Sequence, residues 1–173
     1  MVYMETIEAS KTWECPKTGV WKIICVGGGG AGYAFYNEGT NADGASGGTT
    51  SFGNYVSANG GICGKDAYSD AAVKRTGAIN GFNGFNGAAS YGEQSPEPSG
   101  VGYGASGGAV GSNSGIVHAG RPGSVVSKIL DLTAGTKVAC TVGAGGTGNQ
   151  SKATASYSGL DGAIIVQYLG ESM

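Results

Sequence analysis

Alternation of apolar and polar residues with a period of two marks the chain on both sides of a glycine-dense middle. The clearest run covers residues 20–26, where Trp21, Ile23 and Cys25 share one face. Ile24 lies on the other face, together with a valine at each end of the run. A period of two predicts a β-strand. Apolar residues on both faces indicate a strand that is buried on both sides.

Further runs predict the rest of a β-framework. Residues 5–15 alternate in part, with Ile7, Ala9 and Trp13 on one parity, and predict one edge strand with a wet face. Residues 49–52 and 55–58 flank Gly53-Asn54, a hairpin signal. Three later runs, at 123–132, 136–142 and 163–169, also predict strands, the first two joined by a turn with Gly135 at a position that needs positive φ. About seven short strands without helical periodicity predict an all-β, sandwich-like or jelly-roll-like framework.

Glycine dominates the residues between these runs. Residues 81–87 carry glycine at every third position. A period of three fits neither a helix nor a strand, but it fits a polyproline-II-type helix and so predicts short polyglycine-II helices in a long glycine-rich insertion. We expect one domain over residues 1–173, with its framework in 1–30, 49–60 and 121–173 and its loop region in 31–48 and 61–120. Glycine clusters follow both Val26 and Val142, so we expect both strand ends at the same end of the framework.

Composition narrows the classes of partner. The chain of 173 residues has 36 glycines, only 13% charged residues and a net charge of −2, which argues against a nucleic-acid partner because phosphates attract a basic surface. Nine tyrosines, four phenylalanines and two tryptophans argue against a wholly disordered middle. The chain has no apolar run of about 20 residues, so we expect no membrane insertion. The first residues lack a basic and an apolar region, so we expect no signal peptide.

Metal and catalytic signatures are not expected. The four cysteines form no C-x-x-C motif and His118 is the only histidine, so we predict no metal site and interpret the cysteines as small buried apolar residues, with a disulfide left open. We interpret His118 as structural rather than as a catalytic base. The carboxylate pairs Asp66/Asp70 and Glu93/Glu97 lie among polar loop residues, which predicts solvated side chains rather than a hydrolase. The chain is therefore expected not to be an enzyme.

The motif Gly27-x-Gly29-x-x-Gly32 follows a strand, as a dinucleotide fingerprint does. That fingerprint needs a helix whose N-terminus holds the pyrophosphate, and residues 33–44 have no helical pattern. We therefore expect neither a nucleotide nor any other cofactor.

Aromatic residues in the glycine-rich region are the binding candidates. Tyrosine gives rigid amphipathic area, while serine and asparagine give adaptable hydrogen bonds. The alternative for the two phenylalanines is that they cover the framework as a satellite cluster. The candidate receptor-binding residues are Tyr33, Phe35, Tyr36, Phe82, Phe85, Tyr91 and Tyr103.

Four blocks of the chain resemble, in the same order, the glycine-rich domains at the tips of bacteriophage and prophage tail fibres. They are an opening with an aromatic residue, a proline turn, a β-run and polyglycine, then two glycine-bounded blocks and a closing strand, at 13–30, 47–61, 120–146 and 159–168. The chain also resembles the distal adhesins of T-even-like phages and the glycine-rich domain of anaplastic-lymphoma-kinase-type receptors, in which polyglycine-II helices pack together.

The resemblance implies a non-catalytic adhesin of the virion tail that recognises a host. Its partners would be a bacterial cell-surface glycan or protein outside the cell and the rest of the tail fibre, and its assembly a homotrimer. The alternative is a structural or assembly protein whose glycine-rich face packs against a partner chain in a fibre or cell-surface layer.

Overall fold

A computed structural model describes residues 3–35, 42–64, 89–91, 102–111, 116–149 and 155–171. In these ranges the chain forms fourteen β-strands and includes no helix with the length and hydropathy of a membrane span. The strands are β1 (Met4–Ile7), β2 (Lys11–Glu14), β3 (Gly19–Val26), β4 (Tyr33–Phe35), β5 (Ala42–Asp43), β6 (Thr50–Phe52), β7 (Val56–Ala58), β8 (Ala89–Tyr91), β9 (Ala109–Gly111), β10 (Ile116–His118), β11 (Val125–Leu132), β12 (Lys137–Thr141), β13 (Ala155–Ser156) and β14 (Ala163–Gly170).

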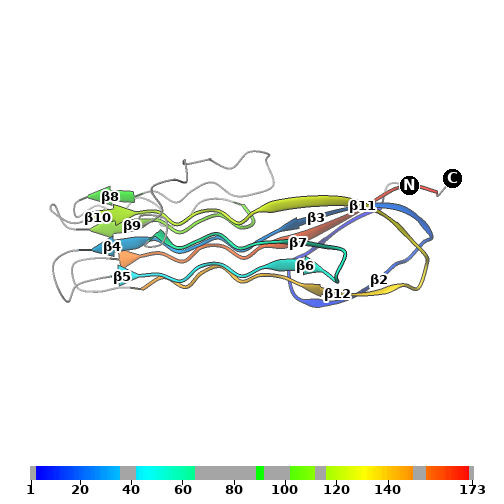
Figure 1. Ribbon diagram of the computed structural model, residues 1–173, viewed down its shortest axis with the longest axis horizontal. Helices are drawn as coiled ribbons and strands as arrows, with labels where there is room; N and C mark the ends of the chain where they lie inside the picture. The colour runs from blue at the N-terminus through cyan, green and yellow to red at the C-terminus, as the bar shows by residue number, and fades with distance from the viewer. Residues whose placement is uncertain are drawn as a thin grey trace.

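Two antiparallel sheets of four strands form one end of the molecule (Figure 1). Sheet A has the order β1-β14-β3-β11, and sheet B has the order β2-β12-β6-β7. The strand predicted at residues 20–26 is confirmed as β3, which pairs with β11 on one side and β14 on the other. The predicted all-β class is confirmed for the described residues, and segments distant in sequence do pair at the centre of sheet A.

The hydrophobic core lies between the two sheets. Every second residue of the central strands enters it, as a period of two requires. Trp21, Ile23 and Cys25 come from β3, while Phe52 and Cys140 come from sheet B. All four cysteines of the chain are buried and free, in agreement with their interpretation as small apolar residues.

Two details differ from the sequence-based expectation. The single edge strand expected over residues 5–15 is divided into β1 and β2, which belong to different sheets, and Ala9 is exposed in the connection between them. The turn at Gly135 has the expected positive φ of 81°, yet it joins β11 of sheet A to β12 of sheet B. Alternation gives the face of a strand but not its partner, so neither crossing could be read from the pattern.

Extended segments leave the sandwich and run side by side away from it (Figure 1). The central segment, residues 27–32, directly continues β3. Its amides donate in turn to three neighbours and return to the same neighbour every third residue. The acceptors of Gly27 to Gly32 are, in order, the carbonyls of Ser124, Gly48, Leu160, Arg121, Ala45 and Tyr157, at 2.9–3.1 Å.

The carbonyls of the central segment accept from three further neighbours. Gly28 and Ala31 accept from the amides of Gly61 and Gly64, Gly29 accepts from Gly146, and Gly30 accepts from Gly107. Six segments therefore surround residues 27–32. Hydrogen bonds also join each of the six to the next, which closes the ring in the order 44–48, 59–64, 119–124, 102–108, 157–162 and 143–149.

The ring closes this tightly because glycines stand where backbones touch. A Cβ on Gly47 would lie 2.1 Å from the carbonyl oxygen of Gly28, and one on Gly120 would lie 2.2 Å from that of Gly30. Each ring segment carries two such glycines, three residues apart, at 44 and 47, 61 and 64, 104 and 107, 120 and 123, 143 and 146, and 159 and 162. Residues 81–87, which carry the strict period of three, lie outside the described residues. Residues 27–30, 59–60, 121–124, 143–149 and 157–162, which the sequence places in the framework, belong to this bundle.

Candidate functional site

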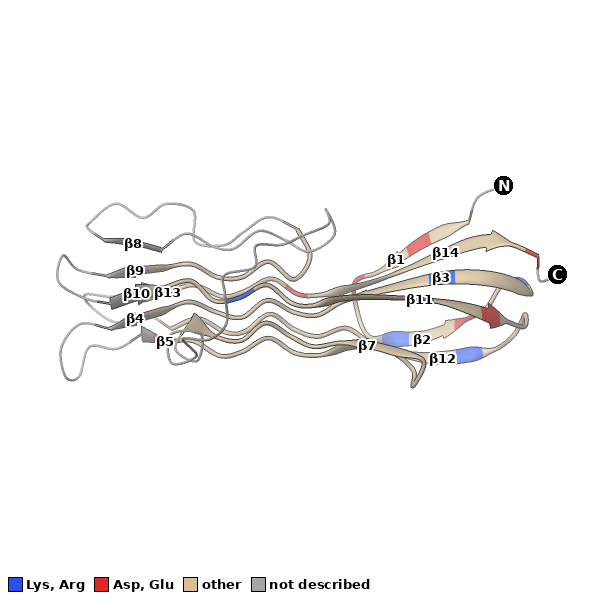
Figure 2. Ribbon diagram, turned by 45° about the horizontal axis from the view of Figure 1, so that its top comes forward, with Lys and Arg blue, Asp and Glu red and all other residues tan. Residues whose placement is uncertain are grey.

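Two small sheets lie at the end of the bundle opposite the sandwich (Figure 1). One is antiparallel, with the order β10-β4-β5, and the other has the order β13-β9-β8, with β8 and β9 parallel. Both chain ends lie beside the sandwich, at the opposite end of the molecule (Figure 2). We call these two small sheets the tip.

Three polar side chains form a row across the first tip sheet. Tyr33 of β4 is directly opposite His118 of β10 and directly opposite Asp43 of β5. Directly opposed residues of antiparallel strands project from the same face. All three are half-buried, and each also takes part in an interaction within the protein. The row therefore places a carboxylate, a phenol and an imidazole side by side on one face, with one carboxylate oxygen of Asp43, Oδ1, buried.

Gly64 packs closely against this row, on the side from which the Tyr33 side chain projects. A Cβ on that residue would lie 2.5 Å from the carbonyl oxygen of His118 and 2.8 Å from the amide of Tyr33. Its amide donates to the carbonyl of Ala31 at 2.9 Å. The end of the ring segment 59–64 thus lies directly against β4 and β10 and holds their spacing.

The row combines groups that suit a polyhydroxylated or amide-bearing ligand. A carboxylate accepts hydrogen bonds, a phenol donates and accepts, and an imidazole does either according to its proton. The tyrosine ring adds an apolar face of the kind that contributes rigid contact area at recognition surfaces.

The other predicted site residues do not all lie in the described part of the tip. Phe35 is opposite Ile116 at the far end of β4, next to the row, and Tyr91 ends β8, opposite Gly111 of β9. Both therefore belong to tip strands. Tyr36, Phe82 and Phe85 lie outside the described residues, and their assignment stays a prediction.

Tyr103 does not belong with this group. Its hydroxyl donates to the carboxylate of Glu8, in the connection between β1 and β2, and this hydrogen bond raises the pKa of Tyr103. The neighbouring Gly104 lies against Val26, the last residue of β3. Six residues of bundle separate that level from Tyr33, about 19 Å at 3.1 Å per residue. Tyr103 is therefore at the base of the bundle, away from the tip, and its assignment as a binding residue stays a prediction.

Asp43 and His118 were not among the predicted binding residues. His118 is 85 positions from Tyr33, and the register that joins them depends on bundle segments with no strand pattern. The only available signal was the G-x-x-G spacing of the ring segments, which fixes how far each segment runs before the next strand begins.

Among the described residues, no cluster of three or more His, Cys, Asp or Glu side chains could hold a metal ion. The candidate site is thus defined by the geometry of the tip. No protein-family model, no curated protein and no solved structure matches this chain.

Proposed function

We propose that this chain is a non-catalytic receptor-binding domain of a phage or prophage tail-fibre tip. In this proposal it binds a glycan or protein on the bacterial cell surface through its tip. The observation that carries the proposal is the polarity of the molecule: both chain ends lie at the sandwich, and the polar row lies at the other end of the bundle. A tip held away from its point of attachment suits contact with a surface.

The sandwich supports the proposal through its topology, which we interpret as a jelly roll. Numbered one to eight in chain order, its strands pair antiparallel as one with eight, two with seven, three with six and four with five. This is the pairing of a long hairpin wound into two sheets, as in jelly rolls, which occur in capsid and lectin domains. All three long insertions, after β3, β7 and β12, leave from the same end.

The stiffness of the bundle also supports the proposed function. We interpret the threefold hydrogen-bond pattern as polyglycine-II geometry, with three residues per turn. Neighbours on all sides satisfy the backbone groups of the central segment, so the bundle forms a rigid support without side-chain packing. Binding residues presented on a rigid support lose less entropy when they bind.

The proposal places the protein in the virion tail, outside the cell that it recognises, with the rest of the fibre as its attachment. The alternative of an assembly protein is less favoured, because it needs a glycine-rich face that is open to a partner. The glycines of the ring instead lie against backbone of the same chain: a Cβ on Gly159 would lie 2.2 Å from the carbonyl oxygen of Gly29.

Binding of the full chain to bacterial surfaces tests the proposal. Labelled protein is added to envelope fractions from a panel of bacteria and to a glycan array, and the dissociation constant is measured on each surface bound. We expect Tyr33→Ala and Asp43→Asn to weaken binding about tenfold, a loss typical of a central contact. The matched control Lys137→Ala, on sheet B, should bind as the original chain does.

Thermal melting separates loss of contact from loss of fold. The tip variants should melt within a few degrees of the original chain, because only one side chain is changed in each. The proposal fails if no envelope or glycan is bound, or if tip and control variants bind equally well.

A further inference from the structure

The outer faces of the two sandwich sheets differ sharply. Sheet B presents only small or polar side chains to the outside, at Thr12, Glu14, Ser51, Ser57, Lys137, Ala139 and Thr141. Sheet A presents apolar side chains on its outer face in all four strands, at Met4, Val20, Ile24, Val125, Ile129 and Ile165. An antiparallel sheet with one face in water normally alternates as sheet B does. Sheet A is therefore more apolar on its outer face than sheet B, although Thr6, Lys22, Ser127, Asp131 and Gln167 also lie there.

The exposed part of this face is at the end nearest the chain termini. Near the bundle, Ile24 and Ile165 are almost fully buried. One row further out, Met4 is 65% exposed and Ile129 is 62% exposed. Leu169, at the end of β14, is 48% exposed. Large apolar side chains gathered at this level of exposure mark an interaction surface.

The order of residues in the outermost complete row of this face suggests which partner covers it. From edge to edge it reads Met4, Gln167, Lys22 and Ile129, each directly opposite the next in the sheet. The two outer positions are large and apolar, while the two inner positions are an amide and an ammonium. Rotation about an axis that runs along the strands, between β14 and β3, exchanges the left and right halves of the row.

We propose that two copies of this chain pack face to face through the outer faces of their A sheets, about a twofold axis parallel to the strands. Met4 of each copy then contacts Ile129 of the other. The ammonium of Lys22 faces the amide oxygen of Gln167. Both tips point in the same direction, so the dimer offers two binding rows to one surface.

Charge favours a twofold axis parallel to the strands over one that runs along the row, the other way to pack two A sheets face to face. An axis along the row itself would place Lys22 against Lys22 of the second copy, two like charges in an interface. The face is otherwise close to neutral, with Lys22 on β3 and Asp131 on β11 as its charged residues (Figure 2). A near-neutral apolar face does not repel its own copy, whereas it offers little to a strongly charged partner.

The size of the face fits a modest dimer. Four strands at about 4.8 Å spacing and about four exposed residues of each at about 3.3 Å cover roughly 250 Å² in projection. Two such faces bury on the order of 700 Å² of accessible surface, the size of a weak and transient interface. We therefore expect micromolar rather than nanomolar association.

Sedimentation of the full chain between about 1 and 500 µM tests the proposal without any receptor, so its result is independent of the proposed function. The expected mass rises with concentration from 17.0 kDa for one chain to twice that value. Ile129→Glu should raise the dissociation constant about tenfold or more, while its carboxylate faces Lys22 within the sheet and so preserves the fold. Ala139→Glu, on the outer face of sheet B, is the matched control and should leave the mass unchanged.

Disulfide capture tests the axis. Met4→Cys and Ile129→Cys chains are mixed under mild oxidation, where the four native cysteines stay buried. The proposed axis gives a covalent dimer between unlike chains, whereas an axis along the row gives like pairs. The proposal is overturned by a single-chain mass at every concentration, by the mass of three copies that the tail-fibre resemblance implies, by an Ile129→Glu chain that still dimerises, or by like pairs alone.

Discussion

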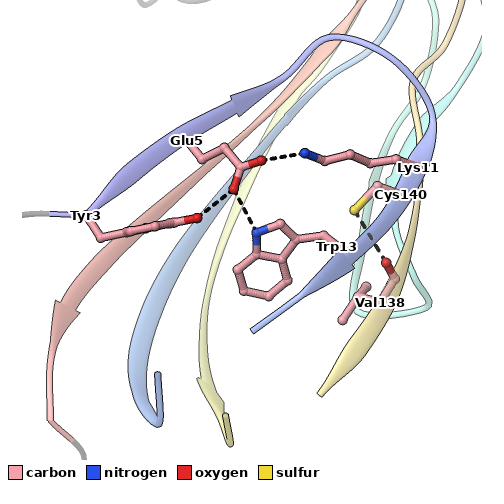
Figure 3. Close-up of polar contacts among 6 residues, drawn as sticks. All are labelled: Tyr3, Glu5, Lys11, Trp13, Val138 and Cys140. Atoms are coloured by element: carbon pink, nitrogen blue, oxygen red, sulfur yellow. Dashed lines mark hydrogen bonds and ion pairs between the residues drawn. The ribbon is translucent and has the colours of Figure 1, made fainter. Parts of the chain in front are cut away.

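The indole nitrogen of Trp13 donates a hydrogen bond of 3.1 Å to the carboxylate of Glu5, and this bond joins the two sheets at one edge of the sandwich (Figure 3). Glu5 belongs to β1, an edge strand of sheet A, and Trp13 belongs to β2, an edge strand of sheet B. The same carboxylate accepts from the Tyr3 hydroxyl at 2.7 Å and from the Lys11 ammonium at 2.5 Å. One side chain thus closes the edge that the division between β1 and β2 would leave open.

Replacement of Glu5 by alanine should destabilise the fold in a pH-dependent way. Burial alone would raise the pKa of Glu5, but hydrogen bonds from Lys11, Tyr3 and Trp13 outweigh it and hold the pKa below its usual value. A carboxyl with a lower pKa in the folded state stabilises above its unfolded pKa, and this contribution is lost as pH falls through the folded pKa. At pH 7 we expect a loss of about 1 kcal/mol, because the group is partly exposed and screened.

Urea denaturation at pH 7 and at about pH 3 measures this effect. The difference between Glu5→Ala and the original chain should shrink as the pH falls through the folded pKa of Glu5, because the carboxyl then becomes protonated in the folded state as well. Glu5→Gln keeps an oxygen that accepts a hydrogen bond from Trp13. Its free energy of unfolding should therefore lie between those of Glu5→Ala and the original chain. A difference that is the same at both pH values would exclude the charged hydrogen bonds as its cause.

Adjacent glycines in one ring segment should respond differently to alanine. A Cβ on Gly47 would lie 2.1 Å from the carbonyl oxygen of Gly28, whereas the nearest atom to a Cβ on Gly48 is 3.1 Å away. Backbone cannot move aside as a flexible side chain can, so Gly47→Ala must open the ring. We expect it to cost about 3 kcal/mol or more, in the range of severe core overpacking, and Gly48→Ala to cost about 1 kcal/mol or less.

Thermal melting of the two variants, with the original chain beside them, makes this comparison. Both substitutions add one methyl group and restrict the unfolded backbone at neighbouring positions to the same extent. The entropic effects of alanine therefore largely cancel when the two variants are compared. Equal melting temperatures would mean that the ring tolerates expansion, and the close packing inferred for the bundle would then be wrong.

The core thiols should resist alkylation in the folded protein. Burial raises the pKa of Cys25 to about 12 and that of Cys140 to about 11. The thiolate is the reactive form, so at pH 8 both groups are almost wholly unreactive. We expect no modification by iodoacetamide at pH 8 over hours in the native state and full modification in urea, read by mass spectrometry. Rapid labelling of either core cysteine in the native chain would contradict the described core.

Strand patterns such as that of residues 20–26 predicted the sandwich well, because each strand buries one face and alternation reports that face directly. The bundle was harder to predict, because a ring segment needs glycine only where its backbone touches another. The pair Gly120 and Gly123, for example, is a single G-x-x-G spacing with Arg121 and Pro122 between its glycines, and one such pair alone does not form a repeat that predicts a bundle segment. The tip row was not predictable, since the register of Tyr33 and His118 depends on how six such segments align along the bundle.

Truncation of Trp21 should unfold the bundle together with the sandwich. Trp21 is completely buried, packs edge-on against Tyr3, Trp13 and Tyr168 with ring centroids 5.1–5.4 Å apart, and donates from its indole nitrogen to the carbonyl of Lys17 at 3.1 Å. Trp21→Ala should cost about 3–5 kcal/mol, and Trp21→Phe, which keeps an aromatic ring but no donor, should cost less.

The same residue tests whether the two parts fold as one. Trp21 lies in β3, and β3 runs without interruption into the central bundle segment at Gly27, so loss of the sandwich removes the register of the segment that all six neighbours contact. Amide hydrogen exchange of Trp21→Ala should therefore rise in residues 27–32 by the same factor as in β3. If residues 27–32 stayed protected while β3 exchanged freely, the bundle would be stable without its sandwich, and the ring rather than the strand pairing would be the source of order in this chain.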